Sequence, residues 1–216
     1  MLSKEHVRAH YDRFGARQDS QAYYEDPATD DMVARGAFSE AQAVFELGCG
    51  TGRFAAGLLE RHLPATATYL GLDVSRTMVD LARARLSRFG TRVEVRLTEA
   101  SGRLPDRASK YDRFISNYVL DLLSEEDIRA VLADAAHVLQ PGGLLCLVDL
   151  THGFTFASRL VARAVTAVHA LKPILVGGCR PIELMDFLSP QHWAVHYQNK
   201  LAPYGVPSHV VVAARK

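Results

Sequence analysis

Short runs of apolar residues recur along the chain and alternate with longer segments whose apolar residues are three and four positions apart. Apolar runs of this length, bounded by turn residues, predict strands that are buried on both faces of a parallel sheet. The predicted strands are Ala43–Leu47, Thr68–Asp73, Arg92–Leu97, Tyr111–Asn117 and Leu144–Asp149. A strand-then-helix alternation predicts a doubly wound α/β fold, which binds its ligands at the carboxyl ends of the strands.

In the segments between these strands, the apolar residues have the three- and four-residue spacing of helices. Gly52–His62 has one apolar face, and Ser75 and Ser124 stand where the N-caps of the next two helices are needed. The Pro-Gly-Gly turn at 141–143 predicts the end of the last of these helices. Pro27 is a typical first residue of a helix and predicts a helix start near the N-terminus.

The chain ends with two strand-like runs, Trp193–Leu201 and His209–Ala214. The link between them is too short for a crossover helix, so they predict an antiparallel hairpin and a mostly parallel, seven-stranded sheet. The chain contains no repeat, low-complexity tract or flexible linker, so we expect one domain over residues 1–216. Its expected parts are a helical cap (1–42), a cofactor-binding core (43–150), acceptor-side helices (151–190) and the terminal hairpin (191–216).

Composition and charge narrow the function. With 48% hydrophobic and 23% charged residues and a net charge of +1, the chain has the composition of a soluble globular protein. It offers no strongly basic face for a nucleic acid. Cys49, Cys146 and Cys179 show no disulfide spacing, which favours a reducing cytoplasm. We expect neither a secretory signal nor a membrane-spanning helix.

The most informative motif joins the first predicted strand to the following helix. Gly48-Cys49-Gly50-Thr51-Gly52 allows a ligand to approach the backbone closely at a helix N-terminus. Arg53 follows where a dinucleotide fingerprint would have its third glycine, and an acid, Glu46, precedes the loop. Asp73 ends the next strand about 20 residues further on, where a carboxylate can accept hydrogen bonds from a ribose. The alternative role of Asp73 as a helix cap is less favoured, because Ser75 already fits the cap.

At these residues the sequence resembles the family of S-adenosylmethionine-dependent methyltransferases with the Rossmann-like fold. FELGCGTG and GLDVS carry the resemblance, which continues through Leu97–Ala100, SKYDRFISNYVLDLL and HVLQPGGLLCLVDL. It covers about residues 44–150. The N-terminal YDRF resembles the start of quinone- and lipid-methylating relatives. One departure is that the family often has Asp where Thr98-Glu99 stands.

The resemblance implies S-adenosyl-L-methionine as the cofactor. The glycine loop and Glu46 would surround its methionine part, Asp73 would hold the ribose, and the remaining residues would contact the adenine or form the floor. The implied cofactor-binding residues are Glu46, Gly48, Gly50, Gly52, Asp73, Val74, Met78, Glu99, Ala100, Asn117 and Tyr118. Methyl transfer relies on alignment in a water-poor pocket, and it needs a base only when the acceptor must lose a proton.

Acceptor-side candidates follow strands or lie in the N-terminal helices. His152 follows the fifth strand and is, with Tyr118, a candidate to orient or deprotonate the acceptor; the alternative is a loop histidine that caps backbone groups. The substrate-binding candidates are Tyr11, Tyr24, Asp121, His152 and Arg180. Tyrosine packing onto the sheet and a surface Arg–Glu pair are the structural alternatives. His192 and His196 have no third ligand nearby, so no metal site is expected.

Three interpretations remain open for Phe154–Lys172. Its apolar residues can share one helical face, and Arg159 and Arg163 lie one turn apart elsewhere. The residues of that face are Phe154, Ala157, Val161, Ala164, Val165, Val168 and Leu171. The segment is a core helix after strand five, a lid over an apolar acceptor, or a basic amphipathic helix on an anionic membrane surface.

The leading hypothesis is methyl transfer to an oxygen, nitrogen or sulfur atom of a small, partly apolar acceptor. A specific version is a phospholipid or quinone acceptor at the membrane surface. A non-catalytic S-adenosylmethionine-binding regulator fits the same loop. Nicotinamide-dependent redox chemistry is disfavoured, because the third glycine of the dinucleotide pattern is missing.

Overall fold

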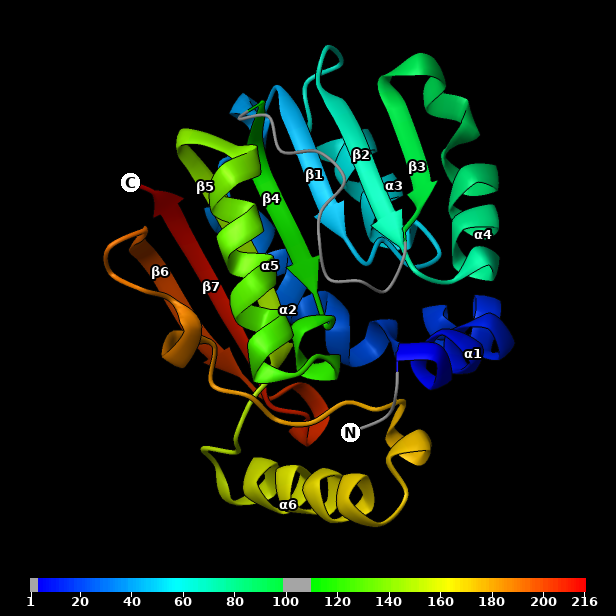
Figure 1. Cartoon of the computed structure of the whole chain (residues 1–216), viewed down its shortest axis with the longest axis vertical. Coiled ribbons are helices and arrows are strands. Elements are labelled where there is room, and N and C mark those ends of the chain that lie inside the picture. Colours follow the sequence, from blue (N-terminus) through cyan, green and yellow to red (C-terminus); the bar gives the residue numbers. More distant parts are fainter. Residues whose placement is uncertain (1–3, 99–109) are drawn as a thin grey trace.

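The structure is a computed structural model, and it describes residues 4–98 and 110–216. Across these residues seven strands form one sheet in the order β3-β2-β1-β4-β5-β7-β6 (Figure 1). The strands are β1 (Ala43–Leu47), β2 (Thr68–Asp73), β3 (Val93–Leu97), β4 (Tyr111–Asn117), β5 (Leu139–Leu150), β6 (Trp193–Leu201) and β7 (Ser208–Arg215). β1 to β5 pair in parallel, whereas β7 runs antiparallel to both β5 and β6. The predicted mostly parallel sheet with a terminal antiparallel hairpin is confirmed.

Helices cover both faces of this sheet (Figure 1). They are α1 (Lys4–Phe14), α2 (Ala22–Arg35), α3 (Arg53–Arg61), α4 (Arg76–Leu86), α5 (Glu125–Val138) and α6 (Phe156–Leu171). Short 3-10 turns connect them: η1 (Gly15–Gln21), η2 (Phe38–Glu40), η3 (Ser87–Arg92), η4 (Leu120–Leu122), η5 (Pro173–Val176), η6 (Leu184–Phe187) and η7 (Pro203–Gly205). α2, α3 and α4 bury apolar side chains against one face of the sheet, and α5 buries its own against the other.

Strand alternation sorts the residues of β1 between these two layers. Phe45 stacks on Phe114 of β4 within the α5 layer, with ring centroids 5.2 Å apart. Val44 belongs to the opposite layer, and Glu46 points to the same side as Val44. The acid before the glycine loop therefore faces α2 and α3 rather than α5.

The predicted N-caps are confirmed. The Ser75 Oγ accepts a hydrogen bond of 3.2 Å from the Met78 N–H at the start of α4. The Ser124 Oγ accepts one of 3.0 Å from the Asp127 N–H at the start of α5. In each case the side chain satisfies a helical N–H that has no partner within the helix.

Two predicted element starts are wrong by several residues. α2 begins at Ala22, so Pro27 lies inside the helix rather than at its start. The residue before α2, Gln21, already has helical backbone angles at the end of η1, so the helix begins one turn earlier and loses a single N–H donor at the proline. β5 begins at Leu139 rather than Leu144, because the Pro-Gly-Gly segment forms a bulge within the strand instead of a turn before it.

The interpretation of residues 154–172 as a core helix is also wrong. α6 packs on η5 and η7 rather than on the sheet, and of its residues Ser158 and Ala162 are buried. Its inward face carries Val161, Val165 and Val168, as expected, but Ala157, Ala164 and Leu171 of the predicted face point to solvent. A helix that docks on loops needs a narrower buried face than one that lies on a sheet, which the apolar spacing alone could not indicate.

The N-terminal helices lie across the carboxyl ends of the parallel strands (Figure 1). α1 and η1 pack on α4, and α2 packs on β7 and β5. Side chains of α1, η1 and α2 therefore meet the glycine loop, which leaves β1 at the same edge.

Candidate functional site

Glycines make the sharp turn between β1 and α3. Gly48, Gly50 and Gly52 have left-handed φ angles of 75°, 52° and 73°, a conformation that glycine adopts readily. A Cβ added to Gly48 would lie 2.2 Å from Cγ2 of Val119, and one added to Gly52 would lie 3.1 Å from Cα of Ala82. A Cβ on Gly50 would meet no atom within 4 Å. Gly48 and Gly52 thus allow close packing of the chain on itself, whereas Gly50 borders open space.

Asp73 fixes the loop to the end of β2. Its Oδ2 accepts a hydrogen bond of 2.9 Å from the Gly50 N–H, and its Oδ1 accepts one of 2.9 Å from the Ser75 N–H. Each carboxylate oxygen can accept a further bond, so Asp73 can hold the loop and a ligand hydroxyl together. Burial raises the pKa of Asp73 to about 6, although the backbone N–H groups favour its ionised form.

Two buried polar side chains reach the loop from the neighbouring strands. Glu46 is 2% exposed and accepts a hydrogen bond from the Tyr69 hydroxyl. Burial raises the pKa of Glu46 to about 8, and the Tyr69 hydroxyl opposes that rise. At the end of β4, the buried Asn117 amide has neither its oxygen nor its nitrogen bonded to a described residue. Buried polar atoms are normally paired, so these atoms indicate a bound ligand or water as their partner.

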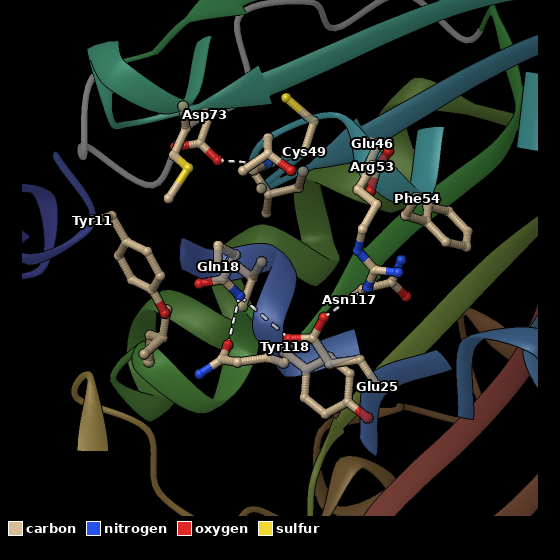
Figure 2. Close-up of a pocket in the computed structure, with 18 of the residues that line it drawn as sticks. Tyr11, Gln18, Glu25, Glu46, Cys49, Arg53, Phe54, Asp73, Asn117 and Tyr118 are labelled. Atoms are coloured by element: carbon tan, nitrogen blue, oxygen red, sulfur yellow. Dashed lines mark hydrogen bonds and ion pairs between the residues drawn. The ribbon is translucent and has the colours of Figure 1, made fainter. Parts of the chain in front are cut away.

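One cavity, the first cavity, collects most of the predicted cofactor residues (Figure 2). Those that line it are Glu46, Gly48, Gly50, Asp73, Val74, Met78, Asn117 and Tyr118. Gly52 does not line it, because its Cα faces α4. Glu99 and Ala100 lie outside the described residues.

A charged group that sequence analysis did not assign also borders the first cavity. The Arg53 Nη2 donates to Glu25 Oε2 at 3.1 Å, and its Nη1 donates to Asp26 Oδ1 at 2.6 Å. Figure 2 shows Arg53 and Glu25 across the cavity from Asp73. Burial outweighs the attraction of Arg53 and raises the pKa of Glu25 to about 7. Arg53 was visible in the sequence as the residue after the glycine loop, but Glu25 lies beside it only because α2 packs there.

Polar contacts hold the N-terminal helices over the first cavity. Asp19 of η1 accepts a hydrogen bond of 2.6 Å from the Thr51 hydroxyl of the glycine loop. Asp19 also pairs with Arg85 of α4 at 2.6 Å. Asp12 of α1 accepts a bond of 2.5 Å from the Ser75 hydroxyl. These contacts place Gln18 and Tyr11 in the cavity wall.

A second cavity of about 280 Å³ lies beside the first. Six residues line both cavities: Tyr11, Gln18, Gln21, Tyr24, Leu150 and Cys179. The volume of the second is near the lower end of small-molecule sites, roughly 300 Å³. Most of its remaining wall is apolar: Phe14, Val161, Ala162, Val165, Val176, Pro181, Val206 and Pro207. Acidic side chains and Arg53 line the first cavity, whereas no Asp, Glu, Lys or Arg among the described residues lines the second. The two tyrosines predicted on the acceptor side therefore lie between a cavity with charged side chains in its wall and one without them.

Tyr118 stands at the end of β4 in an unusual backbone conformation. Its φ of 55° is uncommon outside glycine, and such residues cluster at functional sites. Its hydroxyl shares a hydrogen bond of 2.8 Å with the Ser208 hydroxyl, and its ring meets Tyr24 edge-on at a centroid distance of 5.8 Å. Burial raises the pKa of the Tyr118 hydroxyl.

The remaining acceptor-side candidates lie outside both cavities. His152 is exposed on the loop after β5. Asp121 is fully buried beside Asp149, and burial raises the pKa of Asp121 to about 7. Arg180 donates a hydrogen bond of 2.9 Å to the Leu123 carbonyl. Asp121 and His152 follow the carboxyl ends of β4 and β5, and Asp121 lies behind Cys179, which lines both cavities.

Comparisons with known proteins agree with this geometry. A methyltransferase domain family matches residues 44–143. The demethylmenaquinone methyltransferase of Tropheryma whipplei is 32% identical over 127 residues, which cover 57% of this chain and 49% of that protein. The trans-aconitate 2-methyltransferase of Methylobacterium radiotolerans is 29% identical over 186 residues, which cover 80% of this chain and 67% of that protein. The chain spans about half the length of most curated relatives that it matches.

Among solved structures, a SAM-dependent methyltransferase from Aquifex aeolicus superposes with a TM-score of 0.62. The two are 18% identical, and the match covers 91% of this chain and 93% of that one, which shows a common fold. The matched region contains the glycine loop between β1 and α3 and the acid that ends β2. These matches support the family of S-adenosyl-L-methionine-dependent methyltransferases for this chain, and its fold is the Rossmann-like fold of the solved methyltransferase.

Proposed function

We propose that this chain is an enzyme that transfers the methyl group of S-adenosyl-L-methionine, the cofactor of its family, to an oxygen, nitrogen or sulfur atom of a small, partly apolar acceptor. The observation that carries the proposal is the adjacency of the two cavities, which share six lining residues, the acceptor-side candidates Tyr11 and Tyr24 among them. Methyl transfer requires donor and acceptor to be held side by side in alignment. A cavity lined by charged side chains next to a cavity that has none provides that arrangement.

The residues of the first cavity fit the groups of this cofactor. When bound, the cofactor supplies a methyl group on a positively charged sulfur. Asp73 would accept hydrogen bonds from the ribose hydroxyls while it holds Gly50. Glu46 would pair with the ammonium of the methionine part, and Arg53 with its carboxylate. The unpartnered amide of Asn117 would gain a partner in the same place.

The adenine would lie between apolar side chains at the other end of the first cavity. Val74 and Met78 line that end and would flank the ring. Glu99 and Ala100 would meet the adenine edge, as the family resemblance implies. This assignment places the whole cofactor along the carboxyl ends of β1, β2 and β4.

On the acceptor side, the chain's own residues orient the acceptor and exclude water. Tyr11 and Tyr24 would form the boundary that the methyl group crosses. Tyr118 would orient rather than deprotonate the acceptor, because burial raises the pKa of its hydroxyl. His152 has no part in this proposal, since it is exposed and borders neither cavity.

The relatives named above act on demethylmenaquinone and on trans-aconitate, which differ widely in polarity. The apolar lining of the second cavity favours an apolar acceptor, including the quinone or phospholipid class, over an acidic one. The net charge of +1 favours a small molecule over a nucleic acid. The three cysteines are unpaired, which fits a reaction in the cytoplasm.

The proposal is tested with the purified protein, cofactor labelled in the methyl group, and a panel of acceptors graded in polarity. We expect a labelled product from an apolar acceptor, with the S-adenosylhomocysteine by-product in equal amount. Calorimetric titration should show binding of S-adenosylhomocysteine but not of NADH. Binding without any labelled product, from the panel or from a metabolite extract, would instead support a regulatory S-adenosylmethionine-binding protein. Tight binding of NADH alone would overturn the cofactor assignment.

A further inference from the structure

α6 is the outermost element at one end of the molecule (Figure 1). It contacts η5 and η7, and its buried residues are Ser158 and Ala162. A capping box formed by Thr155 and Ser158 fixes its start, so the helix is well defined without support from the sheet. The side of α6 that faces away from the protein is covered by none of the described residues.

That outer side carries large apolar residues. Phe156 is 88% exposed, Leu160 is 64% exposed and Leu171 is 84% exposed. Helical spacing places these residues in one stripe, with the exposed Ala164 and Ala167 between them. We call these five residues the outer stripe. Contiguous apolar surface of this kind marks an interaction site in a soluble protein.

The charge around the outer stripe has one sign. Arg159 and Arg163 are exposed along one edge of the stripe, and Lys172 follows its end. Neither arginine forms an ion pair with a described residue. From Thr151 to Ile182 the chain contains no Asp or Glu, although acidic and basic residues nearly balance over the whole sequence. The partner that complements this surface therefore offers an apolar region to the outer stripe and negative charge to the basic residues at its edge.

We propose that the outer stripe of α6 binds the surface of a bilayer that contains anionic lipid. Leucine and phenylalanine enter the boundary between headgroups and acyl chains, and the arginines contact the lipid phosphates. None of the described helices is long and apolar enough to cross a membrane, so α6 lies on the surface. An obligate protein interface would pair the arginines or exclude charge from its centre. An anionic lipid surface instead binds both the apolar stripe and the arginines beside it.

The inner side of α6 lines the second cavity, so lipid binding by the outer stripe would bring that cavity to the membrane. Val161, Ala162 and Val165 of α6 line the second cavity, and His10 and Phe14 of α1 line its other side. A membrane-bound α6 would hold this cavity next to the lipid. Only this consequence, the supply of an apolar acceptor from the bilayer, rests on the proposed function; lipid binding itself does not.

Vesicle sedimentation of the full chain without cofactor tests the proposal. The probes are vesicles of phosphatidylcholine alone and of equal parts phosphatidylcholine and phosphatidylglycerol. We expect binding to the anionic vesicles, with weaker binding at high salt. Arg159→Glu/Arg163→Glu should weaken binding at least roughly tenfold, since each basic residue near the surface contributes about 1 kcal/mol. Phe156→Ser/Leu160→Ser should weaken binding even in low salt.

Matched controls lie on the opposite part of the molecule. Arg61→Glu/Arg76→Glu makes the same charge change on exposed residues of α3 and α4 that form no ion pair with a described residue, and it should leave vesicle binding unchanged. Circular dichroism confirms that the variants fold. Equal binding to both vesicle types, or equal losses in the two charge-reversal variants, would overturn the proposal. So would a dimer in solution that fails to bind vesicles and dissociates on Phe156→Ser/Leu160→Ser, because a second copy would then cover the outer stripe. Methyl transfer to a water-soluble acceptor is measured separately, and none of these outcomes would count against it.

Discussion

The two cavities of this protein are built in different ways. The first takes the shape of one wall from backbone: left-handed glycines turn the chain after β1, and the Asp73 carboxylate ties Gly50 to the end of β2. The second is formed by side chains from α1, α6, β5 and the loop before β7. A site formed by backbone tolerates little change, whereas walls made of apolar side chains accept substitution at modest cost. One fold can therefore keep its methyl donor while its acceptor changes.

The largest expected effect comes from disturbing the backbone of the first cavity. Gly48→Ala adds strain at a φ of 75° and a clash with Val119, so the free energy of unfolding should fall by about 2–4 kcal/mol. Binding of S-adenosylhomocysteine should be lost under conditions where the variant is still folded. Urea denaturation and calorimetry measure the two effects.

Gly142→Ala is the matched control for this variant. Gly142 also has a left-handed φ, of 78°, but a Cβ there would meet no atom within 4 Å. The loss of stability should be limited to backbone strain, about 1 kcal/mol, and cofactor affinity should stay unchanged. If the two variants lose stability equally, the close packing at Gly48 is not what requires glycine.

The next effect is a pH dependence that belongs to the first cavity alone. Because burial raises the pKa of Glu46 to about 8, the carboxyl is protonated at neutral pH and must lose its proton to pair with a ligand ammonium. The affinity for S-adenosylhomocysteine should therefore rise with pH by up to about tenfold per unit and level off above about 8. Asp73 and Glu25 also have raised pKa values, so Glu46→Gln is needed to isolate this group.

Calorimetry in buffers of different ionisation enthalpy would detect the released proton directly. Glu46→Gln should bind more weakly at high pH and lose most of the pH dependence. A pH profile that is the same in Glu46→Gln and in the original chain would remove Glu46 from the ammonium site.

Asp73→Ala tests the contact between the first cavity and the ribose. Affinity for S-adenosylhomocysteine should fall at least about tenfold, which corresponds to about 1.4 kcal/mol. Ser124→Ala is the control, because it removes an N-cap bond of the same kind, to the Asp127 N–H, at a residue that does not line the first cavity. Unchanged affinity in Asp73→Ala would contradict the ribose assignment.

The smallest expected effect concerns the second cavity. Val165→Gln places a longer, polar side chain in its wall, so the KM for an apolar acceptor should rise roughly fivefold. The affinity for S-adenosylhomocysteine should not change, since Val165 does not line the first cavity. Ala170→Gln, at an exposed residue of the same helix that lies outside the outer stripe and lines neither cavity, should leave both unchanged. If Val165→Gln also lowered the affinity for S-adenosylhomocysteine, the two cavities would form a single binding site.

Local sequence patterns predicted much of this structure. β1, β2, β4 and β6 have the predicted bounds. For β1, β2 and β4 the reason is that a mostly buried strand between turn residues leaves a short apolar run. The caps at Ser75 and Ser124 were predictable for a similar reason: the side chain bonds an N–H only three residues ahead. Most of the predicted cofactor residues meet in one cavity, since they sit at the ends of adjacent strands.

Helix packing was less predictable. α5 and α6 both begin at a capped residue and both carry apolar spacing. α5 buries Ile128, Val131 and Leu132 against the sheet, whereas α6 lies beyond its edge with Phe156 and Leu160 exposed. A helix shows which residues share a face, but not what that face will meet.

The sequence by itself determined the strand segments, the glycine loop and the caps of α4 and α5, because each depends on residues that are near neighbours in the chain. The bond between Asp73 and Gly50 joins two segments and was not predicted. Only the tertiary structure decided that Glu25 meets Arg53, that Tyr11 and Tyr24 stand between two cavities, and that the outer stripe of α6 faces solvent. Those contacts join segments far apart in the chain. Their geometry follows from how whole helices pack, which no local pattern of residues specifies.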